Sequence, residues 1–76
     1  MMDNIFRDYR RARGYTQCQL ADLLDVDQTT ISKWENGVAY PRVSQLLALQ
    51  RLLRIPNNVL INGMQKIEKQ RSKKNE

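Results

Sequence analysis

The sequence has no histidine and a single cysteine, Cys18, and these two scarcities exclude several kinds of chemistry. A lone cysteine cannot form an internal disulfide, and without histidine zinc lacks its other common ligand. Histidine is also the commonest general base, and no nucleophile–base pair or phosphate-binding loop is evident. We therefore expect no metal, no cofactor and no enzymatic activity, and we interpret Cys18 as an incidental thiol rather than a redox sensor.

The chain also lacks a long apolar run. No segment approaches the roughly 18 apolar residues that span a membrane, and no signal peptide is recognisable. A chain of 76 residues has room for one domain of a few short helices, but not for a catalytic domain beside them. We expect a cytoplasmic protein with no membrane partner.

Positive charge is in excess, with 13 basic against 8 acidic residues, and the excess lies at the two ends. Residues 1–15 carry a net charge of +2 and residues 64–76 a net charge of +3, whereas residues 16–63 are neutral, with four bases and four acids. This balance favours an anionic partner such as nucleic acid, but it also fits a solubilising surface. The motifs of residues 16–63 must decide between these two interpretations.

The first helix is expected to begin at Asp3 or Asn4 as the N-cap and to stop at Gly14. Its apolar residues recur at helical spacing and indicate a buried face. The rest of the helix carries four arginines, which we interpret most simply as a solvated face, although this face could also lie near phosphates: Arg7, Arg10, Arg11 and Arg13.

A very short turn separates the next two helices. Thr16 and Gln19 fit a capping box that begins the second helix, which should end at Asp25. Two residues later Asp27 is placed to cap the first amides of a third helix, residues 28–35, which an Asn-Gly pair ends. The pattern predicts two helices joined by a tight turn.

The remaining chain adds two helices and a basic tail. Residues 43–53 are strongly apolar and are expected to form the central packing helix, and a short fifth helix should close near Gly63. Residues 64–76 are expected to be a tail, either a helical extension as far as Ile67 or disordered. We predict an all-α bundle of five short helices, with one domain over residues 1–63.

These helices resemble those of the Cro/C1-type, XRE-like helix-turn-helix family of phage and bacterial transcription regulators. The resemblance covers residues 5–61 and rests on Thr-Gln-x-x-Leu-Ala from Thr16 followed by Ile-Ser-x-Trp-Glu-Asn-Gly from Ile31. It implies a lambda-repressor-like fold whose third helix enters the major groove of DNA. The family usually has glycine where this chain has Asp25 and Arg54, at positions that tend to need a positive φ.

The outer face of the third helix carries residue types that can read bases. Gln28 offers adenine a paired donor and acceptor, Thr29 suits a base edge or a thymine methyl group, and Lys33 can reach guanine or a phosphate. Ser32 shares this face, and we predict that all four residues contact bases. Trp34 is turned to another side and is expected to lie in the core rather than to stack on a base.

Contacts to phosphates would position this helix without specifying sequence. The candidates are Gln17, Thr30, Arg42 and, as the family resemblance implies, Asn36. Thr30 equally suits a contact with the second helix, and Asn36 equally suits a helix C-cap. The resemblance further implies that Arg10 and Glu35 pair as a structural salt bridge.

One short helix reads only a few base pairs, so we expect a homodimer on a palindromic operator in double-stranded DNA. The candidate dimer residues equally suit the core: Val59, Leu60, Ile61 and Met64. We predict a bacterial or phage-encoded repressor with no evident small-molecule ligand. Two alternatives remain: an antitoxin that autoregulates a toxin–antitoxin operon, and a helix-turn-helix domain used only for protein recognition, as in an antirepressor.

Overall fold

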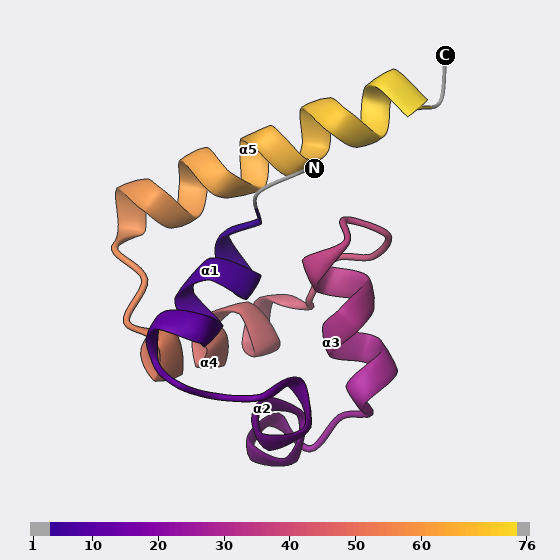
Figure 1. The fold of residues 1–76 in the computed structure, drawn as a ribbon. Helices are drawn as coiled ribbons and strands as arrows, with labels where there is room; N and C mark the ends of the chain where they lie inside the picture. The colour runs from indigo at the N-terminus through magenta and orange to yellow at the C-terminus, as the bar shows by residue number, and fades with distance from the viewer. Residues whose placement is uncertain (1–3, 75–76) are drawn as a thin grey trace.

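The protein folds as a bundle of helices in the computed structural model, which describes the backbone of residues 4–74 and the side chains of residues 4–69. The helices are α1 (Ile5–Ala12), α2 (Gln17–Leu24), α3 (Gln28–Glu35), α4 (Val43–Leu53) and α5 (Asn57–Lys74). α5 runs along one side of the bundle and α2 lies at the opposite side, with α1 and α4 between them (Figure 1). The described residues contain no strand, so the predicted all-α class is confirmed. None of their helices has the length and apolar character that crossing a membrane requires.

The first two helices begin at side-chain caps. Asn4 caps α1 by accepting a hydrogen bond from the amide two residues on, and its Nδ2 donates to the Trp34 carbonyl at 3.1 Å. The alternative cap, Asp3, lies outside the described residues. The predicted capping box of α2 is present: the Gln19 amide donates to Thr16 Oγ1 at 3.0 Å, and the Thr16 amide donates to Gln19 Oε1 at 2.9 Å.

Two turns have the left-handed backbone that the family resemblance led us to expect. Asp25 after α2 and Arg54 after α4 both have a φ of 56°. Aspartate tolerates this conformation, whereas for arginine it costs roughly 1–2 kcal/mol. At the start of α3 Asp27 takes the predicted N-cap position, but the predicted capping bond is wrong, because its side chain makes no capping hydrogen bond. The Asp27 carbonyl accepts from the Thr30 amide at 3.0 Å, and the residue lines the hollow described below.

The core draws on all the helices and on the turn before α5: Phe6, Leu20, Ala21, Ile31, Trp34, Leu49, Leu53, Ile55, Leu60 and Ile67. Trp34 is 3% exposed, which confirms its predicted place in the core. α4 contributes less than its sequence suggests, since Val43 and Leu47 are 74% and 54% exposed. Its apolar band is wider than the surface that the neighbouring helices cover.

The fifth helix is longer than predicted. It does not close near Gly63 but continues as far as Lys74, and Ile67 reaches the core at 3% exposure. Gly63 lies inside the helix, where it allows a close approach to α1: a Cβ built there would lie 2.5 Å from Ile5 Cγ2. α5 thus extends past Ile67, the expected limit of a helical extension, as far as Lys74. The division between a domain over 1–63 and a tail remains a prediction.

We expect Gly63→Ala to lower the free energy of unfolding by about 1 kcal/mol, although alanine favours a helix by a similar amount. The added methyl group would push against Ile5, a stiff β-branched side chain. Urea unfolding of the single variants and of the Ile5→Ala/Gly63→Ala double variant measures the effect. In the Ile5→Ala background the Gly63→Ala change should become neutral or stabilising; a constant effect in both backgrounds would contradict the contact.

Candidate DNA-binding surface

A polar hollow of about 500 Å³ lies where α2 and α3 begin. It is lined by Gln17, Asp27, Gln28, Thr29 and Ser32. The short turn between the helices lets their first residues meet, while the opposite side of α3 is buried through Ile31 and Trp34. The hollow brings together three of the four predicted base contacts and one predicted phosphate contact. Its wall holds donors and acceptors but no apolar side chain.

Gln28 is held at the edge of this hollow by two residues of α2. Its Nε2 donates to Gln17 Oε1 at 3.3 Å, and its Oε1 accepts from the Cys18 thiol at 3.0 Å. A side-chain amide has two N–H donors and two carbonyl lone pairs, so one donor and one acceptor stay available. Those are the groups that a paired contact with adenine needs. The sequence analysis missed the contact of Cys18 with Gln28, since helical periodicity does not reveal pairing between helices.

The Glu35 carboxylate ties α1, α2 and α3 together. Its side chain is fully buried and accepts from Arg10 Nε at 2.6 Å and from Arg10 Nη2 at 3.1 Å, so the predicted ion pair is present. Gln17 Nε2 donates to Glu35 Oε1 at 3.1 Å. Gln17 therefore connects the buried ion pair to Gln28, and its own amide is largely committed inside the protein.

Arg7 was not singled out from the arginines of α1, which were interpreted most simply as a solvated face, with a place near phosphates as the alternative. The solvated interpretation is wrong for Arg7, which turns toward Glu35 as Arg10 was predicted to do. Arg7 Nη2 also donates to Asn36 Oδ1 at 2.9 Å, while Asn36 Nδ2 donates to the Ser32 carbonyl at 2.9 Å. A usable signal existed: residues three apart on a helix lie on one face, so Arg7 shares the face of Arg10.

The other predicted DNA contacts lie around this centre. Thr29 and Lys33 are exposed on α3, whereas Ser32 and Thr30 are half-buried. Arg42 is exposed at the start of α4, and its backbone amide donates to Gln45 Oε1 at 2.8 Å. Arg42 does not line the hollow, so the structure does not bring it together with the base-reading candidates.

The four dimer candidates on α5 have different environments. Leu60 is 8% exposed and belongs to the core, and Val59 and Met64 pack partly against it. Ile61 is 57% exposed and therefore lies on the surface.

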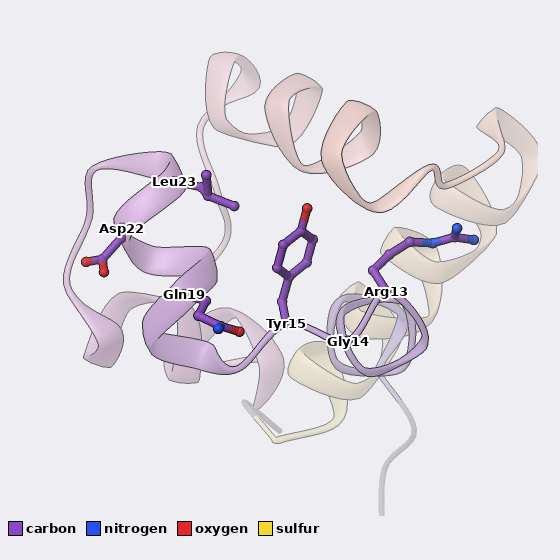
Figure 2. Close-up of a pocket in the computed structure, with 6 residues that line it drawn as sticks. All are labelled: Arg13, Gly14, Tyr15, Gln19, Asp22 and Leu23. Atoms are coloured by element: carbon purple, nitrogen blue, oxygen red, sulfur yellow. The ribbon is translucent and has the colours of Figure 1, made fainter.

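A second hollow, also of about 500 Å³, lies beside Tyr15. Its lining comprises Arg13, Gly14, Tyr15, Gln19, Asp22 and Leu23, none of which lines the first hollow. In Figure 2 the Tyr15 ring stands between α2 and Arg13, while the charged ends of Arg13 and Asp22 point away from it. Because no polar groups converge on this hollow, we assign it no ligand.

Comparisons with known proteins identify the family of this chain. Residues 6–56 match the model of a helix-turn-helix family. The chain is similar to the HTH-type transcriptional activator BcrR of Enterococcus faecalis, with 37% identity over 54 residues. That alignment covers 71% of this chain and 26% of the relative, so the chain spans about a quarter of the relative's length. No solved structure matches significantly. The chain belongs to the Cro/C1-type, XRE-like helix-turn-helix family of DNA-binding transcription regulators.

Proposed function

We propose that the protein is a sequence-specific DNA-binding repressor that acts as a homodimer and inserts the start of α3 into the major groove of a palindromic operator. The observation that carries this proposal is the polar hollow, where Gln17, Gln28, Thr29 and Ser32 gather on an exposed surface while Ile31 and Trp34 anchor α3 from behind. A helix presented in this way can offer its first residues to base edges.

Gln28 is the principal reader in this proposal. Its bonds to Gln17 and Cys18 restrict the amide plane and leave one N–H and one lone pair. A side chain restricted before binding loses less conformational entropy when it pairs with adenine N6 and N7. Thr29 contacts a base edge or a thymine methyl group. Lys33, exposed one turn further along α3, reaches guanine or a phosphate.

Phosphate contacts from four residues would set the register of α3 on the duplex: Gln17, Thr30, Asn36 and Arg42. Arg42 supports this role best, because its exposed side chain makes no ion pair with a described residue. Each phosphate that a cation neutralises releases counterions, so salt should weaken binding steeply.

Dimerisation supplies the second half-site, about one helical turn or roughly 34–36 Å away. Ile61 is the α5 candidate with the largest exposed apolar surface, and Val59 and Met64 would flank it. Leu60 supports the contact from inside, since it is part of the core. The isologous geometry would place each copy of this patch against the other.

The sign of regulation is part of the proposal. Repression follows when an operator-bound dimer covers the promoter. The name of the similar Enterococcus faecalis protein describes an activator, which makes activation the second candidate. A reporter with the operator at different distances from the promoter distinguishes the two, because repression requires overlap with the polymerase site.

The proposal predicts that Gln28→Ala abolishes most of the discrimination at one base pair of each half-site, about 1–3 kcal/mol. The operator is first obtained by selecting bound duplexes from a random library; a recovered palindrome gives sequence and symmetry together. Binding of wild type and variant to the operator and to single-base variants of it then measures the loss. Gln45→Ala, at a glutamine on α4 that does not line the hollow, is the control: it removes the bond to the Arg42 amide, so it can change the affinity for all duplexes alike, but it should leave base discrimination unchanged.

Three results would contradict the proposal in different ways. Equal wild-type affinity for the selected and random duplexes would remove sequence specificity. No duplex binding, together with capture of a protein partner unaffected by Gln28→Ala, would favour a protein-recognition domain. Operator binding together with a co-purifying toxin would favour the autoregulating antitoxin.

A further inference from the structure

The positive charge of Arg7 is in excess, because the buried pair of Arg10 and Glu35 is already neutral. Arg10 meets both carboxylate oxygens of Glu35, at 2.6 Å and 3.1 Å, and so already provides a bidentate partner for its single negative charge. Arg7 adds a second guanidinium, with its Nε 3.5 Å from Glu35 Oε1. The cluster of these three residues has a net charge of +1. The Arg7 side chain is 20% exposed and that of Arg10 9%, so the excess charge reaches solvent at Arg7.

The Arg7 guanidinium is also held in one orientation. Its Nη2 donates to Asn36 Oδ1 at 2.9 Å, and Asn36 is fixed in turn by its bond to the Ser32 carbonyl at 2.9 Å. A guanidinium has five N–H donors in one plane, and these contacts leave Nη1 without a hydrogen-bond partner among the described residues. A planar fork held in this way loses little freedom when it binds an anion.

We infer that Arg7 binds a phosphate of the DNA backbone beside the groove that α3 enters, with Asn36 as the positioning residue for its guanidinium. The inference rests on the proposed function, and it changes the role proposed for Asn36. The side-chain Oδ1 of Asn36 accepts from Arg7, and its Nδ2 donates to Ser32. Because both ends of this side chain are already bonded, the Arg7 guanidinium beside it is the better phosphate ligand. α1 thereby contributes to the DNA-binding surface, although the helix-turn-helix itself consists of α2 and α3.

Another explanation is that Arg7 only stabilises the fold. A cation at the carboxyl end of α3 interacts favourably with the helix dipole and with Glu35. If that were its whole role, replacing Arg7 would lower the stability of the fold but leave the salt dependence of DNA binding unchanged. The two roles therefore separate in one set of measurements.

The experiment measures binding to a mixed-sequence duplex of about two helical turns by fluorescence anisotropy, between about 50 and 200 mM salt. The variants are Arg7→Ala, Arg7→Lys, Asn36→Ala and, as the matched control, Arg11→Ala, which removes the same charge from an exposed position of α1. Circular dichroism melts establish that each variant is folded at the temperature used.

For each bound protomer, Arg7→Ala should lower the slope of log K against log salt by about 0.9 and weaken binding about tenfold at low salt, so a bound dimer should show twice this change in slope. Arg7→Lys should restore the slope but only part of the affinity, because it keeps the charge without the fork. Asn36→Ala should keep the slope and weaken binding severalfold. Arg11→Ala should keep the slope and change the affinity by less than about twofold.

Equal slopes for Arg7→Ala and Arg11→Ala would overturn the inference while leaving the proposed function standing. If Arg7→Ala is unfolded, the affinities of Arg7→Lys and Asn36→Ala test the inference instead. Wild-type affinity in both of these variants would also overturn it. A wild-type chain that binds no duplex would overturn the proposed function and, with it, this contact.

Discussion

Replacing Glu35 by alanine is expected to lower the free energy of unfolding by about 3–5 kcal/mol. The change leaves Arg10, which is 8% exposed, with its charge buried and without its carboxylate partner. It also removes the acceptor of the Gln17 amide and one contact of Arg7. A small domain has a total stability of about 5–15 kcal/mol, so this loss removes a large fraction of it.

Urea unfolding followed by circular dichroism measures this loss, and two variants make it interpretable. Asp22→Ala removes an exposed carboxylate from α2 and should change stability by less than about 0.5 kcal/mol. The double variant Arg10→Met/Glu35→Leu removes both buried charges and should recover most of the loss, because apolar pairs of similar volume often replace buried ion pairs. A Glu35→Ala variant as stable as Asp22→Ala would show that the buried pair does not hold α1 on α3.

Trp34→Ala is the second substitution with a large expected effect, a loss of about 3–5 kcal/mol. Trp34 is 3% exposed, so alanine would leave a cavity between α3 and the rest of the core. Trp34→Phe keeps an aromatic ring in this place and should cost only about 1 kcal/mol. Denaturant unfolding of both variants gives the two values.

The same pair of variants tests whether Trp34 has a role in DNA binding. The residue's burial keeps its ring from a base, so folded Trp34→Phe should bind the operator as the wild type does. Trp34 is also the single tryptophan, so its fluorescence reports burial directly. Emission that shifts on unfolding but not on DNA addition is expected, whereas quenching by DNA together with a weakened Trp34→Phe variant would indicate stacking.

Local features of the fold were predictable because each depends on neighbouring residues. The capping box at Thr16 and the span of α4 were read from the sequence and are present. The positive φ expected at Asp25 and Arg54 is present as well. The cap and the helix span are decided by interactions within a few residues of the chain, where sequence spacing is equivalent to geometry, whereas the positive φ values were expected from the family resemblance.

One error arose where a distant contact overrides a local signal. Gly63 is a common helix terminator by type, yet it lies within α5, which continues to bring Ile67 into the core, and the missing side chain leaves room for Ile5 of α1. Asp27 is a case of another kind: it takes the N-cap position of α3, but its side chain makes no capping hydrogen bond, and no contact with a distant residue among those described explains the difference. Neither outcome follows from residues next to these positions.

The candidate site divides in the same way. Sequence spacing and the family motif place Gln28, Thr29, Ser32 and Lys33 on one face of α3, because helical periodicity is a local rule. The pairings of Gln28 with Cys18 and of Arg7 with Asn36 join residues of different helices, across separations of 10 and 29 residues. Only the packing of α1 and α2 against α3 decides them. From the sequence alone one obtains the helices and the face of α3 that we propose to meet DNA. The tertiary structure decides which side chains hold that face in place, and it gives Arg7 a positive charge in excess of the buried ion pair.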